Sequence, residues 1–332
     1  MILVTGGTGT VGGHLIWHLL MTNERVSALT RNSDHVECLK IVFEFYTDEP
    51  EEYLNRVDWI DGDVLNFGSL KTAFEGIDYI YHCAAIVSLG KSDNSMLLTN
   101  AGGTENVVQA ALACKVKKLC FVNSIAALSD DTSHGPIDEN TPIETGKSVS
   151  TYSQSKMLSE IEIHKGIEQG LNAVIVNPGV ILGISAKMTG SGELFKRVKK
   201  GLPFYTFGKT AYVDVRDVCR AMILLMNSNI SGERFVLVGE NCANKDVLQW
   251  MADGYNRYRP FVGFGKSLIP VASLLEIMGK ICGFTPLLDR SSARTSISRK
   301  EYSSRKFLST FNFTFTSIRQ CICEMCEFDR YR

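Results

Sequence analysis

The sequence predicts an α/β protein built on a doubly wound parallel sheet, with a smaller and mainly helical C-terminal region. Three observations predict this class. Short apolar strands alternate with segments of helical length from residue 1 to residue 178, a glycine-rich turn follows the first strand, and the fifth strand is almost continuously apolar. Strands that alternate with crossover helices are typical of a parallel sheet, and an apolar strand is typical of one covered on both faces.

The first strand covers residues 1–4 and leads into a glycine-rich turn at residues 5–12. Glycine tolerates positive φ and has no Cβ, so the main chain can approach a bound group and present N–H donors. The N-terminus of the helix that follows adds partial positive charge. The turn therefore favours a dinucleotide pyrophosphate, although a tight turn without a ligand stays open and the spacing differs from G-x-G-x-x-G. The candidate contacts are Thr5, Gly6, Gly9, Thr10, Val11 and Gly12.

A second strand over residues 25–30 ends at Arg31, followed by the further donors Asn32 and Ser33. At this position an acidic residue binds the ribose hydroxyls of NAD, whereas an arginine accommodates the 2′-phosphate of NADP. We therefore expect NADP as the cofactor, with NAD less favoured. The alternative role for Arg31 is a solvated side chain at a strand end.

The chain then passes through an irregular stretch, for which we expect a short helix and an extra strand around residues 41–45. A third strand at residues 57–60 leads to Asp63 and Val64. A carboxylate at this strand end can accept a hydrogen bond from the adenine amino group. Asp63 can equally cap the helix that follows.

A fourth strand at residues 77–81 is followed by small residues that include Ala84. Small side chains leave room for a cofactor at the carboxyl edge of the sheet, where ligands of open α/β sheets collect. A long helix over residues 95–114 comes next, with Asn100 and Thr104 on one face.

The residues with catalytic potential follow the fifth strand, residues 118–122. Ser124 comes just after that strand, and a helix that starts near Thr151 carries Tyr152 and Lys156 four residues apart, on one face. A phenol with a pKa near 10 is a poor acid or base at neutral pH. A nearby ammonium group stabilises the phenolate and lowers that pKa, so we predict Tyr152 as an acid/base, with Ser124 bound to the same substrate oxygen.

The sixth strand, residues 172–176, ends at Asn177-Pro178-Gly179. We expect the strand at residues 234–238, together with residues 212–226, to return to the sheet. A basic helix and an aromatic loop precede this part, and the chain after Asn241 reads as mainly helical. The last helix is predicted to start at Ser317, with Gln320 completing a capping box.

These patterns predict two regions. The cofactor-binding domain comprises residues 1–179 plus 211–240, and the substrate-binding region comprises residues 180–210 plus 241–332.

Composition excludes several other classes. The 332 residues contain 35 basic and 36 acidic side chains, so no nucleic-acid partner is expected. Ten cysteines lack paired spacing, which indicates thiols in a reducing cytoplasm, and no signal peptide is expected because the first strand begins at Met1. We expect no metal, because His14 and His18 have no third ligand. Residues 267–278 favour a packed or substrate-covering helix over an interfacial anchor.

These motifs together resemble the extended short-chain dehydrogenase/reductases, the NAD-dependent epimerase/dehydratase superfamily. Residues 5–12 match T-G-x-x-G-x-x-G, and residues 152–156 match Y-x-x-x-K. Asp63-Val64, Asn100 to Asn106, Asn177-Pro178-Gly179 and residues 212–218 also fit the family pattern. The resemblance implies a Rossmann fold and a homodimer. It further implies hydride transfer with Tyr152 as acid/base, Lys156 on the nicotinamide ribose and Ser124 on the carbonyl.

Within that family, residues 121–128 are most similar to the dihydroflavonol 4-reductase and 3β-hydroxysteroid dehydrogenase branch. Asn123 departs from the Ser or Thr frequent there, and we expect it to alter substrate contacts. The resemblance implies an NADP(H)-dependent reductase or dehydrogenase of a fairly apolar small molecule. A nucleotide-sugar epimerase with tightly held NAD and a non-catalytic NADP-sensing protein are the alternatives.

Overall fold

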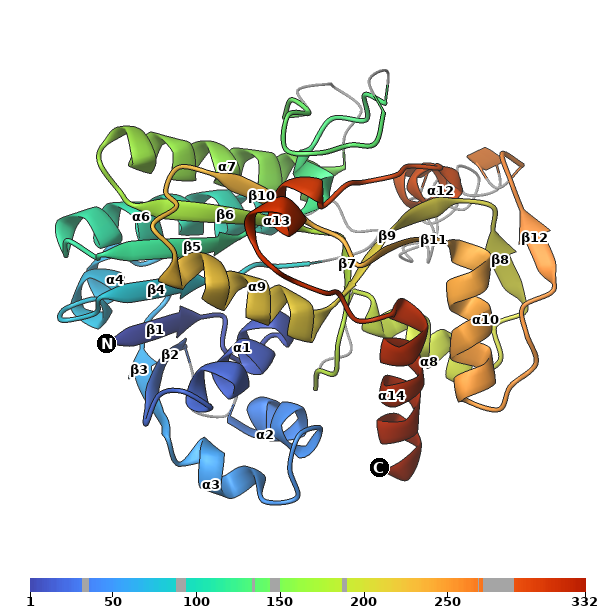
Figure 1. Ribbon diagram of the computed structural model, residues 1–332, viewed down its shortest axis with the longest axis horizontal. Coiled ribbons are helices and arrows are strands. Elements are labelled where there is room, and N and C mark those ends of the chain that lie inside the picture. The colour runs from blue at the N-terminus through green and yellow to red at the C-terminus, as the bar shows by residue number, and fades with distance from the viewer. Residues whose placement is uncertain are drawn as a thin grey trace.

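A parallel sheet of seven strands forms the larger part of the molecule, in the order β10-β6-β5-β4-β1-β2-β3 (Figure 1). The computed structural model describes residues 1–31, 36–87, 94–132, 135–143, 150–186, 190–267, 269–270 and 290–332. Every neighbouring pair in this sheet is parallel, as the sequence predicts. The strands are β1 (Ile2–Thr5), β2 (Val26–Thr30), β3 (Val57–Asp61), β4 (Tyr79–His82), β5 (Lys118–Val122), β6 (Ala173–Pro178) and β10 (Arg234–Leu237).

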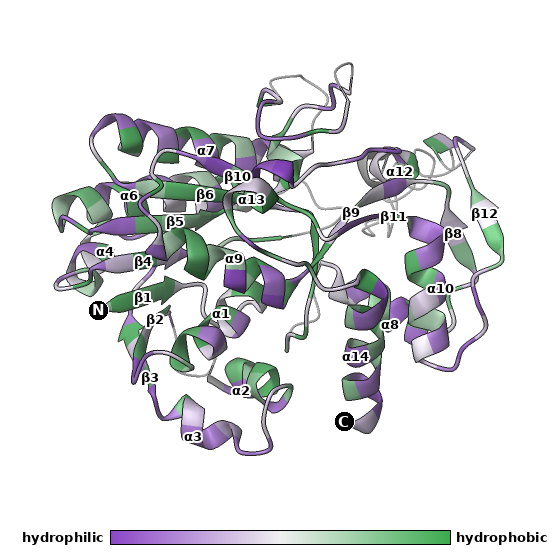
Figure 2. Ribbon diagram, viewed as in Figure 1, coloured by the Kyte–Doolittle hydropathy of each residue, from purple (hydrophilic) through white to green (hydrophobic). Residues whose placement is uncertain are grey.

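Helices cover both faces of this sheet, so successive residues of a central strand enter two different cores. In β5, Leu119 packs in the core beneath α6 and α7, whereas Cys120 packs in the core beneath α1 and α9. Figure 2 shows the resulting apolar strands between helices with polar outer faces. One face carries α1 (Thr10–Leu20), α2 (Val36–Glu44), α3 (Pro50–Leu54) and α9 (Val215–Asn227); the other carries α4 (Phe67–Ala73), α5 (Asn94–Leu97), α6 (Gly103–Ala113) and α7 (Thr151–Glu168).

The smaller part of the molecule combines two short sheets with helices. Strand β9 (Lys209–Asp214) pairs in parallel with β7 (Val180–Leu182) and antiparallel with β11 (Glu240–Ala243). A second pair joins β8 (Phe204–Thr206) to β12 (Val262–Phe264). The helices are α8 (Gly192–Lys199), α10 (Asn244–Gly254), α12 (Arg290–Ile297), α13 (Arg305–Thr310) and α14 (Ile318–Tyr331).

Several local predictions are wrong. Residues 41–45 form no strand, because Leu39, Val42 and Phe43 recur at helical spacing and bury one face of α2. Of the segments expected to return to the main sheet, β10 joins it beside β6, but β9 belongs to the three-stranded sheet. The chain after Asn241 also contains strand structure, in β11 and β12, and the expected aromatic loop contains β8.

The capping box predicted at the last helix is also wrong. Ser317 occupies the N-cap position of α14 but makes no side-chain cap bond. Gln320 instead donates to Glu324, 2.8 Å away, and the free N–H of Ile318 donates to Glu240 Oε1 at 2.9 Å. The carboxylate of Glu240, from strand β11, therefore replaces the expected local cap.

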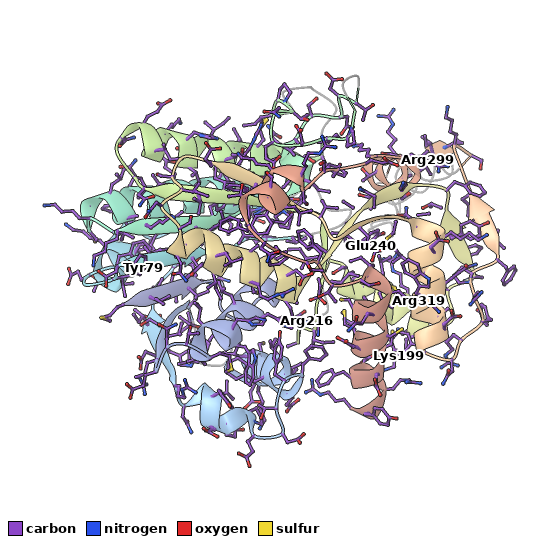
Figure 3. All side chains as sticks on the ribbon, viewed as in Figure 1. Tyr79, Lys199, Arg216, Glu240, Arg299 and Arg319 are labelled. Carbon is purple, nitrogen blue, oxygen red and sulfur yellow. The ribbon has the colours of Figure 1, made fainter. Side chains whose placement is uncertain are left out.

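Charged side chains hold α14 against the larger part. The guanidinium of Arg216, which is labelled in Figure 3, lies between Asp214, 2.5 Å away, and Glu324, 2.6 Å away. Nearby, the buried Asp217 accepts from the main-chain N–H of Thr316 at 2.6 Å. No helix in the described ranges is long and apolar enough to cross a membrane. Residues 268 and 271–278 of the apolar segment 267–278 lie outside those ranges.

Candidate active site

The glycine turn connects β1 to α1 through a tightly packed main chain. Gly6 has φ +72°, a left-handed conformation that favours glycine, and its carbonyl accepts from Gly9 N at 2.9 Å. A Cβ on Gly12 would lie 2.2 Å from that same carbonyl oxygen, so the first turn of α1 packs directly on the turn. The N-cap, Gly9, supplies no side-chain bond to α1.

This geometry fits the phosphates of a dinucleotide. The first N–H groups of a helix have no partner within the helix, and α1 has no side-chain cap to occupy them. They and the helix dipole therefore offer donors and partial positive charge to an anion. Thr10 and Val11 are partly exposed at this N-terminus, next to the exposed Gly9. The donor set of the turn is thus suited to a pyrophosphate.

The other candidate residues lie along the same edge of the sheet, because parallel strands end on one side. Thr5 pairs in register with Leu29 of β2 and with His82 of β4, and His82 pairs with Phe121 of β5. Ala84 follows β4, and its main chain lies close to Gly6. A Cβ added to Gly6 would lie 2.7 Å from Ala84 N. Pro178 ends β6 at this same carboxyl edge and is buried.

Arg31 and Asp63 lie at the ends of the two outer strands. Arg31 follows β2 directly and its side chain is exposed. The donors predicted beside it, Asn32 and Ser33, lie outside the described residues. Asp63 does not cap the next helix: Asn66 caps α4, while Asp63 Oδ1 accepts from Leu65 N at 3.0 Å. Val64 is buried against Gly103 of α6.

Ser124, Tyr152 and Lys156 meet at the end of β5. Ser124 is extended and caps a short 3₁₀ turn, with its Oγ accepting from Ala126 N at 3.1 Å. Tyr152 lies in the first turn of α7, close enough to Ser124 for that side chain to influence the pKa of the phenol. One turn further along, the buried Lys156 donates from Nζ to the carbonyl of Val122 at 2.9 Å. The three side chains thus occupy one strand end, as the sequence predicts.

Burial dominates the acid–base properties of this group. It raises the pKa of Tyr152, and the interaction with the Ser124 side chain opposes that rise. It lowers the pKa of Lys156 to about 8, with the nearby Cys83 acting in the opposite direction. The prediction that Lys156 brings the pKa of Tyr152 below its usual value is therefore wrong for this structure, because desolvation of the phenol outweighs the effects that favour the phenolate.

Asn100 holds the segment after β4 against α7. It lies in a π-helical segment, Leu98–Gly102, which interrupts the long helix predicted over residues 95–114. Its amide accepts from Ile86 N at 2.7 Å and donates to Ile86 O at 3.0 Å and to Ser155 Oγ at 2.9 Å. Such π-helical turns are frequent at functional sites. Asn100 therefore fixes main chain at the carboxyl edge.

A buried carboxylate lies behind Ser124. Glu160 is fully buried on α7 and accepts from Arg234 Nη1 at 2.9 Å and from Asn177 Nδ2 at 3.2 Å. Asn177 also donates to the main-chain carbonyl of Ser124 at 3.1 Å. Asn123 is 3% exposed and donates to the same carboxylate, and its expected effect on substrate contacts stays a prediction. The hydrogen bond to Glu160 thus holds the side-chain amide of Asn123 in the interior.

The two histidines weighed as metal ligands both lie against the ring of Tyr46. His14 is buried and bonds with the hydroxyl of Tyr46 and, at 3.0 Å, with the carbonyl of Ile184. His18 stacks edge-on against Tyr46. Among the described residues, no group of three or more His, Cys, Asp or Glu side chains could hold a metal ion.

Sequence reasoning missed several polar residues that organise this site. His82, Ser155, Glu160 and Asn177 are all buried and hydrogen-bonded within it. Two signals point to them. His82 and Asn177 occupy strand ends, and Glu160 follows Lys156 by four residues, on the same face of α7.

Comparison with known proteins covers nearly the whole chain. A putative dihydroflavonol 4-reductase from Synechocystis sp. is 27% identical over 334 residues, which span 97% of this chain and 92% of that protein. Cinnamoyl-CoA reductase 1 from Petunia hybrida is 25% identical over 335 residues, 98% of this chain and 90% of the relative.

Solved structures agree on the fold. The crystal structure of gox2253 matches with a TM-score of 0.83 and 26% identity, covering 100% of this chain and 98% of that one. UDP-glucose 4-epimerase from Thermotoga maritima matches with a TM-score of 0.77 at 16% identity, covering 99% and 98%. This second likeness shows the Rossmann-like fold alone.

Residues 2–239 match the family described as the NAD dependent epimerase/dehydratase family. That range contains the glycine turn, Ser124, Tyr152 and Lys156. The chain belongs to this family and is an NAD(P)-dependent enzyme of the short-chain dehydrogenase/reductase type.

Proposed function

We propose that this protein is an NADP(H)-dependent oxidoreductase that reduces a carbonyl, or oxidises a secondary alcohol, of a fairly apolar small molecule. One observation carries the proposal: Ser124, Tyr152 and Lys156 converge at the end of β5, on the sheet edge that also carries the uncapped N-terminus of α1. Relatives named dihydroflavonol 4-reductase, cinnamoyl-CoA reductase and tetraketide α-pyrone reductase support a reductase.

Each side chain has a definite part in this proposal. When bound, the nicotinamide supplies or accepts the hydride. Tyr152 donates its hydroxyl proton to the substrate oxygen during reduction and takes it back during oxidation. Ser124 donates a hydrogen bond to that oxygen, which stabilises negative charge as it develops. Lys156 holds the nicotinamide ribose, and its ammonium group favours the phenolate that Tyr152 becomes after giving up its proton.

The cofactor contacts extend along the sheet edge. Arg31 would bind the 2′-phosphate of NADP, and the presence of an arginine instead of an acidic residue directly after β2 supports NADP over NAD. Asp63 and Val64 would hold the adenine end, and Ala84, Asn100 and Pro178 would help to form the cofactor site along the same sheet edge. Residues 5–12 bind the pyrophosphate. The cofactor domain in this proposal is residues 1–179 plus 211–240, and residues 180–210 plus 241–332 bind the substrate.

The substrate is proposed to be apolar because apolar side chains are exposed just after β4, next to the main chain that Asn100 binds. Ile86 and Val87 follow β4 with 38% and 44% of their surface exposed, and Asn100 fixes the main chain at Ile86. We also propose a cytoplasmic homodimer. The buried thiols of Cys120 and Cys219, which are free, support a reducing compartment.

The test is a screen for NADPH oxidation against ketones, aldehydes and steroid-like carbonyl compounds, run beside NADH. Turnover of an apolar carbonyl with preference for NADPH is the expected result. An epimerase would instead copurify with NAD and consume none, and a sensing protein would bind NADPH without oxidising it in the presence of any compound. Either of these outcomes would reject the proposal.

A further inference from the structure

A chain of buried hydrogen bonds connects the start of the glycine turn to the helix that carries Tyr152. Thr5 Oγ1 lies 2.8 Å from His82 Nδ1, and His82 Nε2 lies 3.1 Å from Thr104 Oγ1. The chain continues through Asn100 to Ser155, whose hydroxyl donates to the carbonyl of Tyr152 at 2.8 Å. Each of the five side chains is at most 1% exposed; they are Thr5, His82, Thr104, Asn100 and Ser155.

The donors of this chain fix the tautomer of His82. The hydroxyl of Thr104 donates to the carbonyl of Asn100 at 2.6 Å, so its oxygen can only accept from His82. His82 therefore carries its proton on Nε2 and presents a lone pair on Nδ1. Thr5 must then donate to Nδ1, which leaves its oxygen to accept from Ala84 N at 3.3 Å. Each polar hydrogen of these five side chains is therefore donated to one acceptor.

The surroundings keep His82 neutral. Burial and, to a smaller extent, the positive charge of Lys156 lower the pKa of His82 to about 3. The imidazole also lies flat against Phe121, with 5.4 Å between ring centroids, and the ammonium of Lys156 lies 5.3 Å from the same Phe121 ring. A cationic imidazole would repel Lys156, whereas a neutral one leaves the ammonium group undisturbed.

We propose that His82 is a positioning residue that sets the separation between the cofactor turn and the Tyr152 helix. It links Thr5, at the last position of β1, to the π-helical segment that holds α7 in place. Because it acts through Thr104 and Asn100, it touches neither substrate nor cofactor. The inference rests on the proposed function for its effect on turnover, but the structural link itself is independent of turnover.

The first experiment needs no activity. Imidazole nitrogen NMR on ¹⁵N-histidine-labelled protein should show His82 as the Nε2–H tautomer, unchanged from about pH 6 to about pH 9. The signal is assigned by its loss in His82→Asn. An Nδ1–H tautomer, or a titration within this range, would overturn the proposal.

The second experiment measures turnover in His82→Phe, Thr104→Val and the double variant. His82→Phe keeps an aromatic ring against Phe121 but removes both hydrogen bonds. We expect kcat to fall about 10- to 100-fold, with the Kd for NADPH within about 3-fold of wild type and a larger primary isotope effect with deuterated NADPH. The kcat of the double variant should be no lower than that of the slower single variant, because both substitutions interrupt the same series of hydrogen bonds.

The control is Ser228→Ala, which removes a hydroxyl that donates to Leu225 O at 2.8 Å just after α9, beside Lys118 at the edge of the sheet where β5 begins. It should lower Tm to a similar extent as Thr104→Val without lowering kcat. Additive losses in the double variant, or wild-type kcat in folded His82→Phe, would reject the positioning role. Should His82→Phe fail to fold, His82→Gln replaces it, because its amide keeps a donor for Thr104. Wild-type protein without turnover on any carbonyl would refute the proposed function instead, and the NMR result would still decide the state of His82.

Discussion

Glu160 and Arg234 form an ion pair across 74 residues of sequence, with 2.9 Å between Oε1 and Nη1. Arg234 also donates to the carbonyls of Glu139 and Thr141, at 2.9 and 2.6 Å. The pair therefore joins α7 and β10 to residues 139–141, directly behind the main chain of Ser124. A single buried carboxylate thus supports one wall of the candidate active site.

Glu160→Gln should destabilise the protein by about 3 kcal/mol, because it leaves the guanidinium of Arg234 without its buried counter-charge. Urea unfolding at pH 7 measures this loss. The matched control is Glu162→Gln on the same helix, which breaks a more exposed pair with Lys165 and should cost about 0.5 kcal/mol or less. Equal losses in the two variants would contradict the role of burial.

The pH dependence of this effect has a definite sign. Burial raises the pKa of Glu160, but hydrogen bonds and charge from His164, Arg234 and Asn177 outweigh it and leave the pKa below its usual value. The stabilising contribution is thus present above the unfolded pKa of about 4.3 and is lost as the pH falls through the lower folded pKa. The stability difference between wild type and Glu160→Gln should shrink below about pH 4. A difference that stays constant down to about pH 3 would contradict this assignment.

Lys156 should give the activity an alkaline limit. Since burial lowers its pKa to about 8, the ammonium group is lost as the pH rises through that value, and kcat/KM should fall above it. In Lys156→Arg, the guanidinium stays protonated, so this limb should move to higher pH. Lys156→Met should be slower by at least about 100-fold with no limb near pH 8. If the fall in kcat/KM above about pH 8 were unchanged in Lys156→Arg, a group other than Lys156 would be responsible for it.

Arg31→Asp should reverse the preference between cofactors. Removal of the guanidinium should raise the dissociation constant of NADPH by about 10-fold or more. The new carboxylate can accept hydrogen bonds from the ribose hydroxyls of NADH. The control is Arg25→Ser at the opposite end of β2, where Arg25 pairs with Asp58 across exposed surface. Isothermal titration with both cofactors measures the ratio of the two dissociation constants. The same ratio in wild type and Arg31→Asp would reject the 2′-phosphate contact.

Gly12→Ala should damage both the fold and the cofactor site. Its Cβ would lie 2.2 Å from Gly6 O, so the turn must shift, at a cost of about 1–3 kcal/mol. NADPH affinity should fall in parallel, as followed by quenching of protein fluorescence. Gly102→Ala is the control, because a Cβ there meets no atom within 4 Å. If Gly12→Ala bound NADPH like wild type, the turn would not be the pyrophosphate site.

The sequence predicts the sheet well because its signals are local. Glycine spacing, apolar strands and the four-residue spacing of Tyr152 and Lys156 can all be read over a few positions. The partners of His82, Asn123 and Glu160 could not be predicted, since each is brought together by strands or helices far apart along the chain. Strand β11 was missed for the same reason: Glu240 to Ala243 gain their strand conformation by pairing with β9.

The position of Arg234 also bears on how the chain is made. Strand β10 completes one edge of the main sheet, yet it is synthesised 74 residues after Glu160. At ribosomal rates of about 5–20 residues per second, helix α7 waits roughly 4–15 s for the charge that neutralises its buried carboxylate. During that interval Glu160 stays exposed to water or protonated, and the wall behind Ser124 closes only after β10 has left the ribosome.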